Sequence, residues 1–87
     1  MNKIEQYDII TLKNGNEYTV IKILNEQQKK YYLLAPIDEA EEPDMENIKI
    51  MEEVINGNKT LVQDIKDEEL LKKLSKMFLQ SLRESLE

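Results

Sequence analysis

The apolar residues change their spacing near Asp67, and this change restricts the fold more than any other feature of the chain. From that point they recur every three or four residues, at Leu70, Leu71, Leu74, Met77, Phe78 and Leu82. This spacing predicts an amphipathic helix over about residues 67–86. Asp67 is suited to cap its N-terminus, and Glu68 and Glu69 suit the positive end of the helix dipole. A helix with one apolar stripe needs an apolar surface to cover.

The residues before this helix include runs rich in β-branched and aromatic side chains, which predict strands within about residues 7–63. The expected strands cover residues 7–12, 17–24, 31–35, 48–55 and 59–63. Asn14-Gly15 lies between the first two, and both residue types tolerate the positive φ of a type I′ turn. A second tight turn is expected at Asn56-Gly57-Asn58. Residues 25–30 are polar and predict a turn longer than two residues.

These elements predict a single α+β domain over residues 1–87. Its antiparallel sheet would hold about five short strands, arranged as two hairpins plus a middle strand, and the C-terminal amphipathic helix would cover one face. Tyr31 and Tyr32 are adjacent in the middle strand, so their side chains point to opposite faces. We therefore expect one of the two to be exposed on the face away from the helix, where it would offer a contact surface.

Residues 38–47 form an acidic segment that is interrupted by Pro43. Its carboxylates belong to Asp38, Glu39, Glu41, Glu42, Asp44 and Glu46. Close like charges repel and proline breaks regular structure, so we predict an exposed, mobile loop. Such a loop offers oxygen ligands that a calcium ion could use, but the spacing is not that of an EF-hand. We interpret the loop as solvated.

The composition removes most routes to catalysis. The chain contains no cysteine and no histidine, so thiolate nucleophiles and imidazole bases are absent. Gly15 and Gly57 are the only glycines, which excludes a glycine-rich phosphate loop. Ser75, Ser81 and Ser85 have no histidine to activate them. We predict that the protein is not an enzyme and uses no cofactor.

The charge balance of the chain bears on its partners. Twelve basic residues stand against eighteen acidic ones, a net charge of −6. A field of this sign repels phosphate backbones and anionic lipids, so we expect no direct nucleic-acid or membrane binding. The N-terminal residues lack the apolar run of a signal peptide, which predicts a cytoplasmic location. A protein partner with a basic surface is the expected complement.

Several stretches of the chain resemble a known family. They are the strand Ile9–Leu12 leading into Gly15-Asn16-Glu17, the segment Leu33–Glu39, the strand Ile48–Met51 and the helix start Asp67–Leu70 with Phe78. Together they resemble the YrzB-like family of small acidic bacterial proteins, also catalogued as domain of unknown function 1292. The resemblance extends from about Tyr7 to Leu82 and supports the α+β fold. It implies no activity, so no functional residue is carried over.

Taken together, these features predict a protein–protein interaction or regulatory module. Its candidate contacts are the carboxylates of the acidic loop and a narrow apolar strip of the helix formed by Leu79, Leu82 and Leu86. This strip would permit either a homodimer or the docking of another protein. The alternative function is that of an acidic nucleic-acid mimic, which would inhibit a nucleic-acid-binding protein by occupying its binding groove.

Overall fold

The computed structural model describes residues 4–37, 40 and 42–85. Its elements in chain order are β1 (Ile9–Thr11), β2 (Glu17–Glu26), β3 (Lys29–Pro36), β4 (Lys49–Asn56), β5 (Lys59–Asp64) and α1 (Glu68–Ser85). The strands form one antiparallel sheet in the order β1-β2-β3-β4-β5. The predicted α+β class, with about five strands and a C-terminal helix, is therefore confirmed. Within the described residues, no helix is both long and apolar enough to span a membrane.

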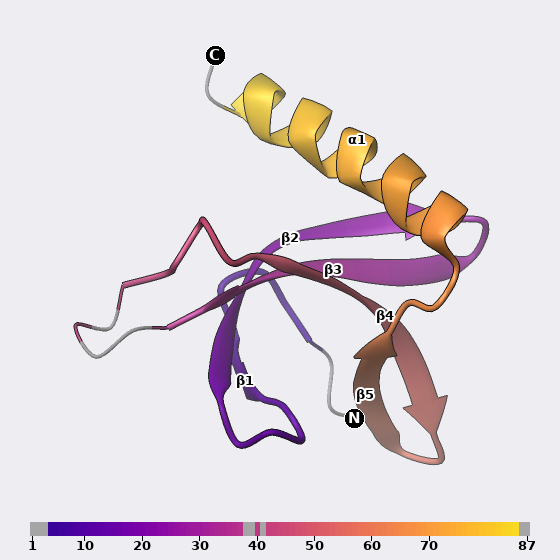
Figure 1. Cartoon of the computed structure of the whole chain (residues 1–87). Helices are drawn as coiled ribbons and strands as arrows, with labels where there is room; N and C mark the ends of the chain where they lie inside the picture. Colours follow the sequence, from indigo (N-terminus) through magenta and orange to yellow (C-terminus); the bar gives the residue numbers. More distant parts are fainter. Residues whose placement is uncertain (1–3, 38–39, 41, 86–87) are drawn as a thin grey trace.

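The sheet is curled rather than flat. Figure 1 shows α1 lying on one side of β3, while the β1–β2 hairpin and the β4–β5 hairpin both bend away on the other side. A bulge in β2 helps to produce this bend, because Val20 pairs with Leu34 while the next pair is Lys22 with Leu33. Ile21 is the extra residue, and an extra residue of this kind bends a strand and increases its twist.

The bulge also changes which side chains face which side of the sheet. Tyr18 and Val20 contribute to the apolar cluster on the face away from α1, and so does Ile23 three residues after Val20. Ile21 and Leu24 pack on the helix side, again three residues apart. Strict alternation would have kept Val20 and Ile23 on opposite faces. The bulge therefore shifts the alternation by one residue, so that both parts of β2 supply apolar side chains to both faces.

The described residues form two apolar clusters, one on each face of the sheet. The curl core lies on the face away from α1 and contains Tyr18, Val20, Tyr32, Leu34 and Met51. The helix core lies under α1 and contains Tyr31, Leu33, Leu74 and Phe78. Because both faces of β3 are covered, Tyr31 and Tyr32 are 5% and 0% exposed. The expectation that one tyrosine would be exposed is wrong, and the reason is the curl of the two hairpins.

Two of the three hairpin turns differ from the prediction, whereas the tight turn predicted at Asn56-Gly57-Asn58 is confirmed. Gly15 has φ +84° but Asn14 does not have a positive φ, so the first turn is not type I′. Gln27 and Gln28 have φ values of 50° and 68°. The pairing of β2 with β3 extends to Glu26 and Lys29, which directly flank these two residues. Residues 25–30 therefore hold a two-residue turn, where a longer turn was predicted. Gly57 alone has a positive φ in the third hairpin, as in a type II′ turn.

The helix begins as predicted. The carboxylate of Asp67 accepts hydrogen bonds from the backbone N–H groups of Glu69 (3.0 Å) and Leu70 (3.3 Å). These bonds satisfy two of the N–H groups that a helix start leaves without partners. Leu74 and Phe78 then project into the helix core, and they are 0% and 2% exposed. The apolar stripe read from the sequence is the face that packs on the sheet.

Candidate interaction surfaces

The acidic loop connects β3 to β4, and its second half is ordered by hydrogen bonds. Ile37 forms an isolated bridge with Pro43, and the N–H of Asp44 donates to the carbonyl of Pro36 at 2.7 Å. The Asp44 carboxylate accepts from the Asn47 side-chain amide (2.7 Å) and from the N–H of Glu46 (3.0 Å). These bonds hold the pKa of Asp44 below its usual value, and the bond from Asn47 has the largest effect.

Three of the six predicted loop contacts lie within the described residues. Glu42 and Glu46 are exposed, and Asp44 is half-buried within the turn that it organises. Asp38, Glu39 and Glu41 lie outside the described residues. No group of three or more carboxylates placed to hold a metal ion is found in the part of the chain that the structure describes. The described loop thus presents carboxylates to solvent on a hydrogen-bonded backbone.

The whole net charge of the protein resides in this loop. It contributes six of the eighteen acidic residues and none of the twelve basic ones, so the rest of the chain is neutral. Elsewhere, carboxylates lie beside lysines in the pairs Glu26–Lys73 (3.8 Å), Glu52–Lys29 (3.4 Å) and Asp64–Lys49 (3.6 Å). The net charge is therefore concentrated in one segment of the sequence, and the rest of the sequence is balanced.

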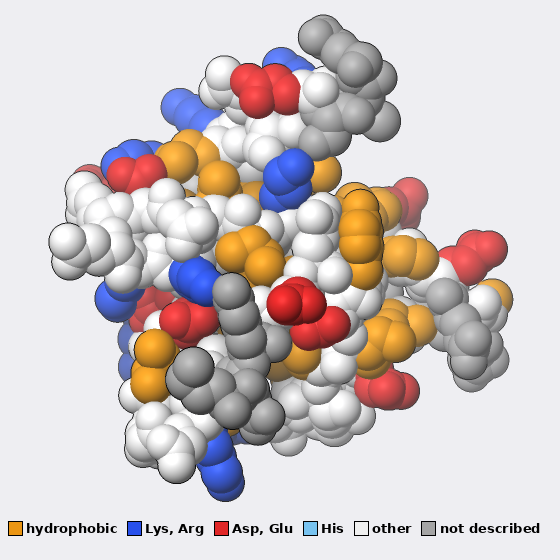
Figure 2. Space-filling view, turned by 180° about the vertical axis from the view of Figure 1, so that it is seen from behind, with side chains coloured by type: hydrophobic (Ala, Val, Ile, Leu, Met, Phe, Trp, Pro, Cys, Tyr) orange, Lys and Arg blue, Asp and Glu red, His pale blue; other side chains and the backbone are white. Residues whose placement is uncertain are grey.

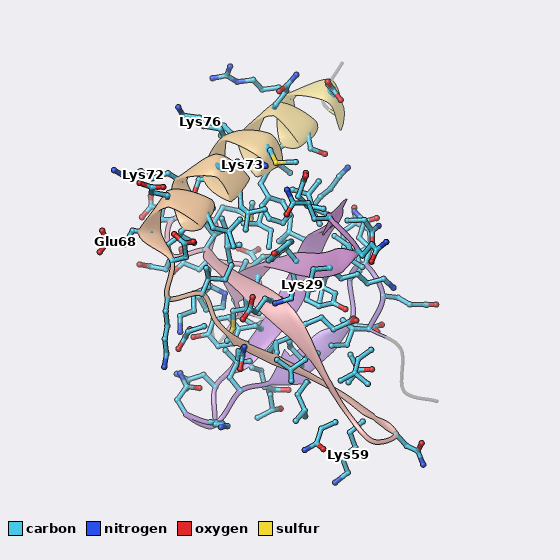
Figure 3. The ribbon with its side chains drawn as sticks, turned by 90° about the vertical axis from the view of Figure 1, so that its right-hand side faces the viewer. Lys29, Lys59, Glu68, Lys72, Lys73 and Lys76 are labelled. Carbon is cyan, nitrogen blue, oxygen red and sulfur yellow. The ribbon has the colours of Figure 1, made fainter. Side chains whose placement is uncertain are left out.

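The predicted apolar strip of the helix is not brought together in the described structure. Leu79 is 54% exposed, whereas Leu82 is half-buried against the helix core. Leu86 lies outside the described residues. Helical spacing places Leu79 on the same face of α1 as Lys72 and Lys76. These two lysines extend outward from the helix in Figure 3. A single exposed leucine between lysines is a normal feature of a solvated helix face.

A partly buried polar pair lies inside the curl and was not predicted from the sequence. The phenol hydroxyl of Tyr32 donates a hydrogen bond to the carboxylate of Glu53. Burial raises the pKa of Tyr32 above its usual value, and the bond to Glu53 and the charge of Glu53 raise it further. The phenol therefore keeps its proton, which suits a structural hydrogen bond. Tyr32 pairs with Met51 in the β3–β4 ladder, so Glu53 is its diagonal neighbour. This contact could not be read from one sequence, because strand order was unknown.

A groove separates the two edges of the curled sheet. It has a volume of about 650 Å³ and lies between the β1–β2 turn on one side and β5 with the following linker on the other. We call it the seam groove. Its apolar lining consists of Leu12, Met51, Val62, Ile65 and Leu70. Its charged lining consists of Lys13, Lys49, Glu52, Asp64, Lys66 and Asp67.

Most charges around the seam groove already have partners. Asp64 pairs with Lys49, Glu52 accepts from Lys29 and from the Gln63 amide, and Asp67 caps α1. Lys13 and Lys66 make no ion pair with the described residues. The groove therefore offers two lysines without an ion pair beside an apolar floor, together with the Asp67 carboxylate, which is held by the N-terminus of α1. Sequence reasoning missed it because its two walls meet only through the curl of the sheet.

The face of the molecule shown in Figure 2 carries its apolar side chains in small, separate groups. In Figure 2, apolar side chains lie in separate groups between acidic and basic ones, without a continuous apolar sheet face. The described apolar side chains with the largest exposed fractions, Tyr7 (71%), Ile55 (69%) and Ile9 (60%), belong to the outer hairpins and the segment before β1. This face of the molecule therefore offers no large, flat hydrophobic docking area.

Comparison with known proteins agrees with the resemblance noted in the sequence. No curated protein and no solved structure gives a significant match to the chain. One protein family does match, and its match spans residues 13–83, from the first hairpin turn to the last part of α1. This span includes all but the first of the five strands. The chain belongs to the family described as "Protein of unknown function (DUF1292)".

Proposed function

We propose that the protein is a protein–protein interaction or regulatory module that recognises a basic surface on its partner through the acidic loop. The observation that carries this proposal is the concentration of the net charge of −6 in residues 38–46. Complementary surface charge steers partners into encounter and selects among them. A neutral body with one acidic end would orient the protein as it approaches a basic surface.

The ordered half of the loop supports the same function. The carboxylate of Asp44 accepts hydrogen bonds from Glu46 and Asn47. These bonds form a turn that holds the neighbouring backbone in place. Glu46 is exposed beside it. A charged side chain on a hydrogen-bonded turn loses less conformational freedom on binding than one on an unstructured chain. We therefore assign Asp44 a positioning role and the other loop carboxylates a contact role.

The test is a salt-graded capture experiment from a bacterial lysate with two matched variants. The loop variant removes five charges and keeps Asp44, with the substitutions Asp38→Asn, Glu39→Gln, Glu41→Gln, Glu42→Gln and Glu46→Gln. The control removes five charges outside the loop, with Glu5→Gln, Glu17→Gln, Glu68→Gln, Glu69→Gln and Glu84→Gln. We expect a basic partner that is lost at high salt and lost in the loop variant but kept by the control. Equal capture by both variants would refute the role of the loop.

The identity of the captured protein then separates two forms of this function. If the partner binds nucleic acid and duplex DNA displaces it, the protein acts as a nucleic-acid mimic. If the partner remains bound in the presence of DNA, the loop serves an ordinary regulatory contact. Capture that resists high salt would instead indicate apolar docking and would count against the acidic loop as the contact.

A further inference from the structure

We propose that the seam groove binds an extended acidic segment of a partner protein, which adds to the open edge of β5 as a further strand. This surface is separate from the acidic loop, so the two proposals can fail independently. Recognition by strand addition needs an unpaired sheet edge and neighbouring pockets for alternate side chains. The structure supplies both features in one place.

The register of the β4–β5 hairpin determines which backbone groups face the groove. Asn56 pairs with Lys59 across the two-residue turn, and Val54 pairs with Leu61 two residues further on. In an antiparallel ladder the directly bonded pairs alternate with non-bonded ones, and the pair that closes a two-residue turn is bonded. Val62 therefore occupies a non-bonded position, so its N–H and C=O point away from β4. They point toward the groove that Val62 lines.

The size and the apolar floor of the groove also suit an extended peptide chain. Its volume of about 650 Å³ lies within the range of pockets that enclose ligands. Its floor continues the curl core, since Met51 belongs to that core and Leu12 and Val62 pack against it. A strand added next to β5 would place every second side chain over this apolar floor.

The charges select the chemistry of the occupant. Lys13 lies on the β1–β2 turn and Lys66 on the linker after β5, so the two cations line opposite walls of the groove. Neither has an ion-pair partner among the described residues. Acidic side chains on the bound strand would neutralise both. A second copy of β5 is a poorer complement, because that strand carries one acidic residue, Asp64, and also the basic Lys59.

The experiment uses two synthetic peptides and nuclear magnetic resonance of the full chain. One peptide is acetyl-Glu-Glu-Val-Thr-Val-Thr-Val-Glu-Glu-amide, and the other replaces each Glu by Lys. We expect the acidic peptide to bind with a Kd of about 1 mM or tighter and the basic one roughly tenfold more weakly. Bound acidic peptide should slow hydrogen exchange of the Val62 amide, while the Leu61 and Gln63 amides are already protected without it.

Variants separate the groove from general charge effects. The variant with Lys13→Glu and Lys66→Glu should reverse the preference between the two peptides. Lys59→Glu is the control, because Lys59 lies at the far tip of the β4–β5 hairpin in Figure 3, away from the groove. The five-charge loop variant should bind the acidic peptide at least as well as the original chain, which distinguishes this proposal from the proposed function.

Several results would overturn the proposal. They are the absence of acidic-peptide binding in this range, unchanged exchange at Val62 on binding, and an unaltered preference in the double lysine variant. Protection of Val62 that grows with protein concentration in the absence of peptide would assign the β5 edge to a second copy instead. Chemical-shift changes confined to the outer face of α1 would place the anion-binding surface there.

Discussion

The phenol of Tyr32 and the carboxylate of Glu53 are hydrogen-bonded inside the curl of the sheet, joining β3 to β4 on the face away from α1. Glu53 pairs across the other ladder with Val62, which lines the seam groove. The pair therefore links the middle of the sheet to the edge where we place partner binding. Removing it should affect both the stability of the sheet and its response to alkali.

Alkaline pH is expected to destabilise the protein through Tyr32. The folded state raises the pKa of this phenol above the ordinary value of 10.0, so the unfolded chain releases the proton first. The contribution to the free energy of unfolding is complete below pH 10 and is lost as the pH rises toward the folded pKa. Urea unfolding between pH 8 and pH 11 should show this loss in the original chain and a smaller one in Tyr32→Phe. Equal slopes for the two proteins would contradict the assignment.

Substitution of the turn residues Gln27 and Gln28 should increase the stability of the protein. Both residues have positive φ without the glycine or asparagine that such turns favour. Replacing them with Asn-Gly should raise the free energy of unfolding by about 1 kcal/mol, measured by urea denaturation. Asn58→Gly is the control in the third hairpin, because Asn58 is not among the positive-φ residues. Glycine makes the unfolded chain more flexible, so Asn58→Gly should lower stability slightly. A gain there as large as the first would show that relief of positive φ is not the source of the effect.

Two adjacent residues of α1 should differ sharply on truncation. Phe78 is 2% exposed in the helix core, and Leu79 is 54% exposed on the outer face. Phe78→Ala should lower the free energy of unfolding by about 3–5 kcal/mol, enough to unfold a domain of this size substantially. Leu79→Ala should change it by less than about 0.5 kcal/mol. A large loss from Leu79→Ala would show that this leucine is buried in an assembly.

The turn of the acidic loop should respond to acid. The pKa of Asp44 is lowered from 3.8, so its carboxylate supports the turn above that value and loses its hold as the pH falls through the folded pKa. The amide resonance of Glu46, which donates to Asp44, should therefore titrate with an apparent pKa below 3.8. Asp44→Ala should abolish this transition, and Glu46→Gln should leave it in place.

The elements that could be predicted are those coded by neighbouring residues. The cap at Asp67 and the stripe through Leu74 and Phe78 depend on spacing within one helix, and both are confirmed. A turn within residues 25–30 was predicted, but its length was wrong. Gln27 and Gln28 are not residue types that favour positive φ, and the pairing of β2 with β3 imposes the conformation. Features that depend on neighbouring residues can be predicted from one sequence, whereas backbone conformations imposed by pairing between strands cannot.

The same distinction applies to the candidate sites, of which one could be predicted from the sequence and the other could not. The acidic loop is a run of neighbouring residues and was found directly, whereas the seam groove joins Lys13 to Lys66 across the molecule. Its existence depends on strand order and on the bulge at Ile21, and neither could be predicted without knowing which strands pair. The same curl buries Tyr32, which is why the expectation that Tyr31 or Tyr32 would be exposed is wrong.

The order of the strands has a consequence for how the chain reaches its structure. Each described strand pairs only with its neighbours in the chain, and the longest connection between paired strands is the loop from Pro36 to Lys49. Short connections lose little entropy on closing, and topologies dominated by near-neighbour contacts fold quickly. The first three strands can therefore zip together while the remainder is still being synthesised. The helix, which is made last, then shields the exposed side of β3 from other nascent chains.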